Sequence, residues 1–122
     1  MKILDAIKLG VEKAESMDIK VAIAVVDSRG EVVAIYKMEG AYPFTPQVAY
    51  MKARAAAIFR RPTAELAERA SQNLPLYLGL TVHAGLIFGK GGLPTKEGGV
   101  GVSGGTGDQD EEVAREVVRA LS

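Results

Sequence analysis

The segment GVGVSGG, residues 99–105, satisfies two patterns that carry chemistry in other proteins. Gly99, Gly101 and Gly104 have the G-x-G-x-x-G spacing of a dinucleotide-binding loop, in which bare backbone approaches a pyrophosphate. Gly101, Ser103 and Gly105 have the G-x-S-x-G spacing of a sharp turn that presents a nucleophilic serine. The two interpretations exclude each other, because one makes the loop a phosphate cradle and the other makes it a nucleophile.

The residues around this segment argue against both kinds of chemistry. A pyrophosphate is held by the positive N-terminus of the helix after the loop, but the next helix here begins with DQDEE, residues 108–112, whose four acids repel phosphate. The serine turn belongs to hydrolases in which the histidine follows the serine. The single histidine, His83, precedes Ser103 by twenty residues. We therefore expect a binding protein rather than an enzyme, and an enzyme that uses Ser103 or His83 is the least favoured alternative.

Glycine is concentrated around this segment, where it makes up ten of the 23 residues from 85 to 107. Glycines in strands mark places where another group comes close to the backbone. That group is either a helix or neighbouring subunit that packs on the sheet, or a ligand that lies on a floor of backbone amides. The ligand alternative makes a site of these residues: Gly91, Gly92, Ser103, Gly104 and Gly105.

Few side chains are suited to hold a metal or a ligand. The chain has no cysteine, so His83 is the best candidate for a metal ligand, above all for iron, although a single histidine in an apolar stretch also fits a buried core residue. Lys52 and Arg54 fit either a solvated helix face or a clamp for ligand carboxylates. The less favoured candidates for iron are Tyr36, Met38, Tyr42 and Tyr50.

Composition narrows the class of protein. Fifteen basic residues balance fifteen acidic residues, so no net positive charge draws the chain to nucleic acid or anionic lipid. A hydrophobic content of 48% supplies one core, and we expect a single domain over residues 1–122. The first twenty residues carry charges every few positions, unlike a signal peptide or a membrane span. We expect a cytoplasmic protein with neither nucleic acid nor membrane as a partner.

Periodicity predicts the first elements of the fold. Apolar residues at spacings of three and four predict a helix over residues 3–17. Two apolar runs predict strands over 20–27 and 31–38, joined by a turn in which the carboxylate of Asp27 bonds the backbone. The first of these strands is apolar on both faces, which is typical of a central strand.

The middle of the chain contains two signals for the start of a helix. Thr45 before Pro46 predicts the cap and first turn of a helix that runs to residue 59. Thr63 after a proline predicts the cap of a short helix over residues 64–70.

The last part of the chain predicts two or three short strands within residues 85–107 and then a helix. The acidic residues 108–112 fit either a cation site or a helix start, and the spacing of Asp108 and Glu111 favours a capping pair. Hairpin-linked strands with helices on both sides predict an α+β sandwich around an antiparallel five-stranded sheet.

In order and spacing, four of these segments resemble one known family. They are AIAVVDSRGEVVAIYKMEGA (22–41), AYMKARAAAIFRRPTAEL (49–66), GGLP (91–94) and GGVGVSGGTGDQDEEVA (98–114). The family is the GlcG-like family, also called the haem-degrading or HbpS-like family. It includes the C-terminal domain of PduO-type cobalamin adenosyltransferases.

The resemblance implies a profilin-like α/β/α sandwich, homo-oligomers and, in some members, a bound haem or corrinoid-type tetrapyrrole. Iron ligands in haem-binding members include a histidine of the first helix, and this chain has no histidine there. We expect a self-associating domain that holds a haem or cobalamin-type tetrapyrrole, or a similar carboxylated small molecule, between the second helix and the glycine-rich strands. The alternative is an accessory oligomer without a ligand of its own.

Overall fold

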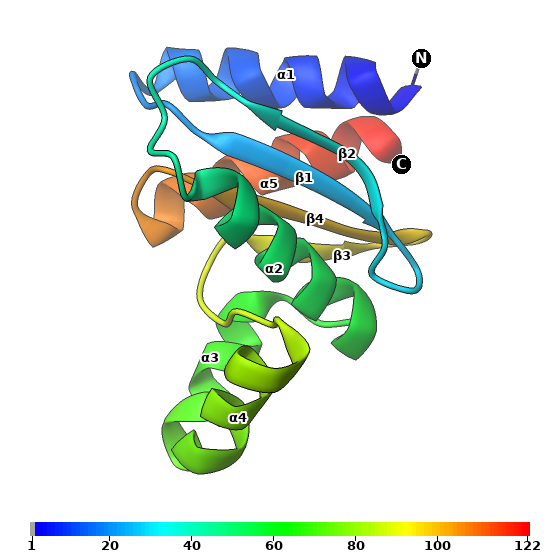
Figure 1. Ribbon diagram of the computed structural model, residues 1–122. Helices are drawn as coiled ribbons and strands as arrows, with labels where there is room; N and C mark the ends of the chain where they lie inside the picture. The colour runs from blue at the N-terminus through cyan, green and yellow to red at the C-terminus, as the bar shows by residue number, and fades with distance from the viewer. Residues whose placement is uncertain (1) are drawn as a thin grey trace.

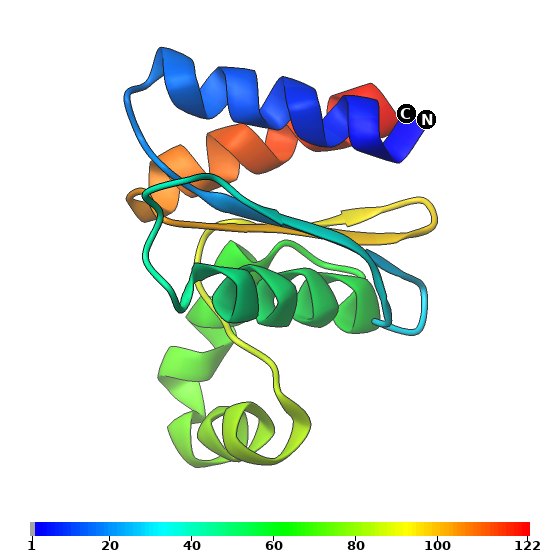
Figure 2. The same ribbon diagram turned by 45° about the horizontal axis from the view of Figure 1, so that its top comes forward.

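A sheet lies between two helical layers in residues 2–122, the part of the chain that the computed structural model describes (Figure 1). α1 (Lys2–Ser16) and α5 (Gly107–Leu121) lie side by side on one face of the sheet, and α2 (Thr45–Phe59) covers the other face. α3 (Thr63–Gln72) and α4 (Leu74–Ala84) follow α2 and project away from the sheet (Figure 2).

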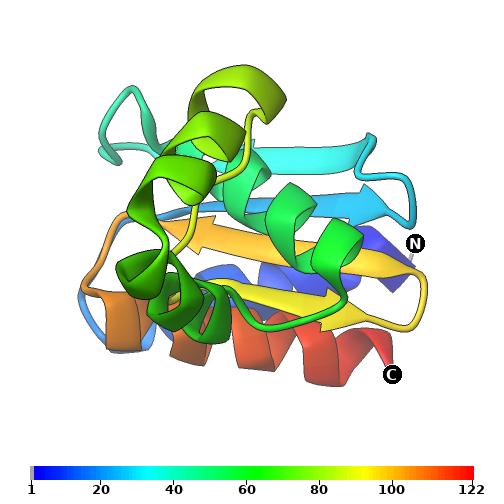
Figure 3. The same cartoon turned by 90° about the horizontal axis from the view of Figure 1, so that it is seen from below.

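The sheet has four strands in the order β2-β1-β4-β3, and all neighbours are antiparallel. The strands are β1 (Ala22–Asp27), β2 (Val32–Lys37), β3 (Gly92–Thr95) and β4 (Gly98–Ser103). Figure 3, seen from below, shows α2 lying over the central strands β1 and β4. The predicted α+β class with an antiparallel sheet is confirmed.

The prediction of five strands is wrong, because the described residues form four. The glycine-rich region supplies only β3 and β4, and the segment before β3 is a loop. Gly85, Gly89 and Gly91 in that loop have φ values of 68°, 142° and 122°, which lie outside the β region. The glycines that suggested another strand are therefore the residues that prevent one.

β1 is the central strand that its apolar pattern predicts, and it is buried on both faces. Ile23 and Val25 point into the core under α1 and α5, where they meet Val113 and Val117 of α5. On the other face, the small side chains of Ala22, Ala24 and Val26 pack against α2. Large residues thus face the helix pair and small residues face the single helix.

α2 lies unusually close to β4, because glycines and alanines meet at the contact. A Cβ at Gly99 would collide with the carbonyl oxygen of Ala53, and a Cβ at Gly101 would collide with that of Ala49. Ala57 of α2 lies in the same contact, beside Gly99. These two glycines therefore serve helix packing, which is the first of the two alternatives that the sequence left open.

The two threonines predicted to cap helices have other roles, so both predictions are wrong. α2 begins at Thr45 itself, whose hydroxyl donates to the carbonyl of Tyr42 at 2.7 Å. α3 begins after Pro62, and the hydroxyl of Thr63 accepts a hydrogen bond from the amide of Gly92 at 2.8 Å. Both threonines are fully buried. The hydroxyl of Thr45 bonds a carbonyl three residues earlier in the chain, and that of Thr63 bonds a strand 29 residues away, so neither is left to cap its helix.

α5 begins with a capping box that lies two residues earlier in the chain than the predicted one. The hydroxyl of Thr106 accepts from the amide of Gln109, and the side chain of Gln109 accepts from the amide of Thr106. The predicted pair of Asp108 and Glu111 does not cap the helix, because the helix starts at Gly107 and leaves Asp108 inside its first turn.

α4 was not predicted, because its apolar residues show no helical period. It has Pro75 in its first turn and ends at Gly85, whose left-handed conformation is typical of a helix C-terminus. Four of its large apolar side chains are exposed: Leu74, Leu76, Leu78 and Val82. Among residues 2–122, no helix combines the length and the apolar character that crossing a bilayer requires.

Candidate functional site

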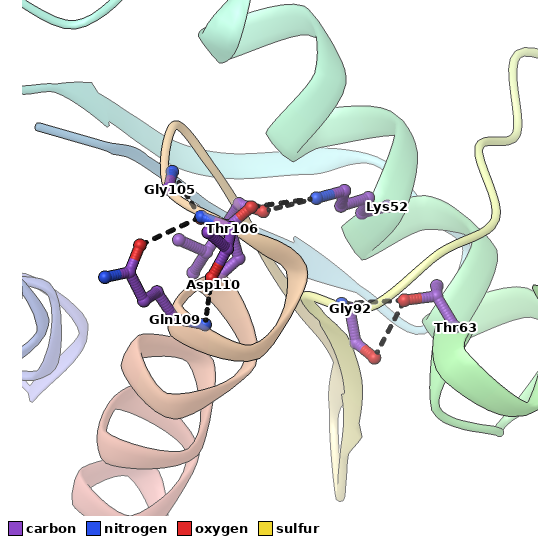
Figure 4. A network of polar contacts seen from close by, with 8 residues as sticks. Lys52, Thr63, Gly92, Gly105, Thr106, Gln109 and Asp110 are labelled. Carbon is purple, nitrogen blue, oxygen red and sulfur yellow. Dashed lines mark hydrogen bonds and ion pairs between the residues drawn. The ribbon is translucent and has the colours of Figure 1, made fainter. Parts of the chain in front are cut away.

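A buried polar cluster joins α2, the glycine-rich strands and α5 (Figure 4). At its centre, the ammonium of Lys52 donates to the carbonyl of Val102 at 2.9 Å and pairs with the carboxylate of Asp110 at 3.3 Å. The other carboxylate oxygen of Asp110 accepts from the amide of Gly105 at 2.8 Å. Both side chains are almost fully buried, with 10% of Lys52 and 5% of Asp110 exposed.

Electrostatics in this cluster are set by burial. Burial raises the pKa of the Asp110 carboxyl above its ordinary value of 3.8, while Lys52 and the amides of Gly105 and Gly104 act in the opposite direction. Within the described residues, every fully buried side-chain nitrogen and oxygen has a hydrogen-bond partner. The cluster is therefore closed on itself and offers no unpaired group to a ligand.

The cluster contains most of the residues that the sequence singled out as a ligand site. Gly91 lies so close that a Cβ would sit 2.9 Å from the Lys52 ammonium, and its φ of 122° favours glycine. Gly92 exchanges hydrogen bonds with the hydroxyl of Thr63. Ser103 is buried at the end of β4, with 5% of its surface exposed, and Gly104 packs against the backbone of Lys20.

The expectation that this region holds a carboxylated ligand is wrong for Lys52. Its ammonium already has a carboxylate and a carbonyl of the chain as partners, and no space separates α2 from β4 above Gly99 and Gly101. An ammonium that is only 10% exposed and is paired inside the chain does not reach an external propionate while this packing holds. Lys52 and the glycines do lie together, but their contacts are with other parts of the same fold.

The loop after β4, where the sequence offered a dinucleotide-binding pattern, has partners within the chain. Its amides are already occupied, since Gly105 donates to Asp110 and Thr106 donates to Gln109. Each of the four acids in residues 108–112 has a basic partner: Asp108 pairs with Lys90, Asp110 with Lys52, Glu111 with Arg115 and Glu112 with Lys13. Over residues 2–122 no three acidic or histidine side chains come together as a metal site, so the cation alternative finds no support.

Arg54 and His83 lie apart from this cluster, at the junction of α2 with α4. The guanidinium of Arg54 donates from Nε to the carbonyl of Ala84 at 3.3 Å and so fastens the end of α4 to α2. His83 precedes Ala84 and is exposed, which contradicts a buried core histidine. The imidazole therefore points to solvent at the end of an apolar helix.

An apolar groove lies on the opposite layer of the molecule, between α1 and the edge strand β2. It has a volume of about 250 Å³, and its walls are Leu4, Ile7 and Val11 of α1. Two residues with polar ends, Lys8 and Tyr36, complete its lining. Leu4 is 55% exposed and Tyr36 is 49% exposed, so the groove is open to solvent.

Sequence reasoning did not find this groove, although its parts were visible. Leu4, Ile7 and Val11 belong to the apolar stripe that predicted the first helix. The stripe is wider than the surface that the sheet covers, and Leu4 is left outside. Tyr36, a less favoured candidate for iron, lies opposite Ile23 in the sheet and on the side of α1.

A second and larger hollow, of about 810 Å³, lies between the ends of α1 and α5 and the two hairpin turns. Its lining mixes apolar residues such as Val33 and Leu121 with the charged residues Lys2, Asp27, Lys96 and Glu97. None of the described residues that line it has an imidazole, phenol or thioether, the side chains that usually hold haem iron.

Solved structures with the same fold include three relatives. A double mutant of HbpS from Streptomyces reticuli has a TM-score of 0.89 and 33% identity, over 99% of this chain and 84% of that one. Klebsiella pneumoniae protein ORFY has a TM-score of 0.90 and 28% identity, over 98% and 87% of the two chains. A PduOC complex with haem has a TM-score of 0.90 over 99% and 92%, and at 24% identity it shows the fold alone.

Two curated proteins are similar in sequence. The corrinoid adenosyltransferase PduO of Salmonella typhimurium is 28% identical over 94% of this chain, but the chain spans only 36% of the length of that enzyme. A 15.0 kDa protein of Citrobacter freundii is 31% identical over 90% of this chain and 82% of its own length. The family of haem-degrading HbpS-like proteins matches residues 2–119. Sequence and fold agree on this point, and the chain belongs to the haem-degrading HbpS-like family.

Proposed function

We propose that this chain binds haem in the apolar groove between α1 and β2, and that it associates with copies of itself. The observation that carries the proposal is the groove, whose walls are apolar and whose lining includes one basic residue, Lys8, and one phenol residue, Tyr36. Ligand sites for apolar molecules have this character, with a few placed polar groups among hydrophobic side chains. Membership of a family named for haem degradation supports haem as the ligand.

The residues of the groove match the parts of a haem molecule. The porphyrin is planar and apolar, and Leu4, Ile7 and Val11 offer it an apolar wall. The propionates are carboxylates, for which the Lys8 ammonium is a counter-ion. A tyrosine oxygen is an established haem ligand, so the Tyr36 phenol is our candidate for the iron. When bound, haem would supply the redox chemistry of its iron, which amino-acid side chains lack.

His83 is the second candidate for the iron, because it is the only imidazole of the chain. It lies on the exposed end of α4 among apolar neighbours, and it lines neither of the two hollows described above. A cobalamin-type tetrapyrrole is the alternative ligand of the same shape class. An accessory oligomer without a ligand is the competing function, and the exposed apolar side chains of α4 favour it.

Titration of the purified protein with haemin, followed at the Soret band, tests the proposal. We expect a shifted band that saturates at a fixed stoichiometry. Tyr36→Phe should move the band because it removes the iron ligand, and Tyr42→Phe should not, because Tyr42 is exposed outside the groove. Leu4→Glu should weaken binding by about tenfold or more, because it places a charge on the apolar wall. Leu9→Glu, on an exposed leucine of the same helix outside the groove, is its matched control.

Two results would contradict the proposal. A spectrum no different from that of free haemin would remove haem, and a parallel titration with a cobalamin would then test the alternative tetrapyrrole. Loss of the band in His83→Ala, with no change in Tyr36→Phe, would show that the iron ligand is His83 of α4 and not Tyr36. A stable multimer that ignores both tetrapyrroles would support the accessory oligomer.

A further inference from the structure

α4 is an apolar helix that the rest of the chain covers on one side only. Its inner side packs on a small cluster, where Tyr77 meets Phe88 edge to face and Leu80 and Ala84 contact buried residues of α2 and α3. The outer side is exposed, with 56% of Leu78 and 71% of Val82 in contact with solvent. A helix that is apolar all round is normally buried, so α4 lacks a partner in the single chain.

The outer side of α4 has a pattern that fits a copy of itself. Helical spacing places Pro75, Leu78, Gly79 and Val82 along this side. If two such helices pack antiparallel about an axis between residues 78 and 79, Pro75 of each faces Val82 of the other, and Leu78 of each faces Gly79 of the other. The largest side chain then meets the residue that has none.

Gly79 offers the space that this pairing requires. A Cβ added there would have nothing within 4 Å, so the surface above Gly79 is open in the single chain. Glycine in the middle of a helix destabilises the helix relative to alanine. No contact within the described chain requires glycine at this position, whereas an incoming leucine does.

Charge argues for a second copy rather than another occupant. Residues 70–89 contain no Asp, Glu, Lys or Arg. A two-fold interface brings each residue near its own copy, so like charges there would repel, and a neutral surface avoids this. Helices that lie on membranes carry basic residues on their polar side, and α4 has none.

We propose that α4 is the surface through which two copies of this chain associate, packed antiparallel with Leu78 of each copy over Gly79 of the other. This inference rests on the self-association proposed above and names its surface. It is independent of haem binding, because the groove lies on α1 and β2, across the sheet from the α3–α4 pair (Figure 1).

Molar mass in solution, measured by light scattering and sedimentation on the full chain, tests the inference. We expect the wild type to exceed the 12.9 kDa of one chain. Leu78→Glu should raise the dissociation constant of this contact by about 30-fold or more and lower the mass by half or to that of one chain. Leu9→Glu is the matched control, since it changes an exposed leucine on the opposite layer and should keep the wild-type mass.

Gly79→Leu separates specific pairing from general adhesion. The change adds apolar surface, yet it fills the space for the partner's Leu78, so we expect weaker association. Tighter association in Gly79→Leu would show that α4 is merely adhesive and would overturn the pairing. An unchanged mass in Leu78→Glu would show that α4 is not the contact surface, and self-association would then use another face. A wild type at 12.9 kDa even at high concentration would overturn self-association itself, whatever the haemin titration shows.

Discussion

Lys52 and Asp110, 58 residues apart in the chain, form an ion pair at 3.3 Å in the interior of the protein. The pair connects α2 to α5, and the Lys52 ammonium also donates to the carbonyl of Val102 in β4. Because both side chains bond only to groups of the same chain, we expect the pair to stabilise the fold.

Lys52→Met leaves the Asp110 carboxylate buried without its cation. Removal of one partner of a buried pair typically costs about 3–5 kcal/mol of unfolding free energy. We expect a loss of this size in urea unfolding at neutral pH. Lys13→Met removes the cation of an exposed pair with Glu112 and should change the unfolding free energy by less than about 1 kcal/mol. Equal effects of the two changes would show that Lys52 is not buried as described.

Stability should depend on pH through Asp110. Burial raises the pKa of this carboxyl above 3.8, so the folded chain holds the proton more tightly than the unfolded chain does. The contribution is therefore fully present below 3.8 and is lost as the pH rises through the raised value. Asp110→Asn cannot titrate, so the unfolding free energy of the wild type minus that of the variant should fall as the pH rises from 3 towards 7. A difference that is constant or rises with pH would contradict the raised pKa.

Gly101→Ala should destabilise the fold, because the new methyl group collides with the backbone of Ala49. Overpacking of this kind costs about 1–3 kcal/mol. Thermal unfolding measures the loss. Gly107→Ala is the control, since Gly107 is exposed and its Cβ would meet only the flexible side chain of Lys90. Stability equal to wild type in Gly101→Ala would mean that α2 can move away from β4 at little cost.

Thr106→Ala should lower the unfolding free energy by about 1 kcal/mol, because it removes the hydroxyl that caps α5. Asp108→Ala should cost less, since Asp108 is fully exposed and makes only a surface pair with Lys90. Chemical unfolding of both variants compares them directly. A larger loss in Asp108→Ala than in Thr106→Ala would indicate that Asp108 caps the helix, as the sequence alone suggested.

Local patterns in the sequence predicted much of this fold. The double apolar alternation of β1 identified a central strand, and the apolar stripe with acidic first turn identified α5. Start signals were less reliable. The hydroxyl of Thr45 donates to a carbonyl of the preceding turn, and the hydroxyl of Thr63 bonds Gly92, which only the folded chain brings within reach. α4 escaped prediction because its apolar residues surround the helix and so lack a period.

The site was harder to predict than the fold. The family resemblance suggested that Lys52 lies near the glycines, but the partners of Lys52 include Asp110, whose carboxylate had been assigned to a helix end. The groove on α1 needs the register of β2, which places Tyr36 against the first helix. Neither relation is visible in local periodicity, since each joins segments that are distant in the chain.

The contact between α2 and β4 also limits how this sequence can change over evolutionary time. Most positions in a core tolerate exchange, because a larger residue at one place can be balanced by a smaller one nearby. At Gly99 and Gly101 the nearest opposing atoms belong to the backbone of α2, and no substitution in α2 can make a backbone smaller. A larger residue at either position therefore cannot be compensated by a second substitution. We expect these two positions to accept fewer substitutions than the rest of the core.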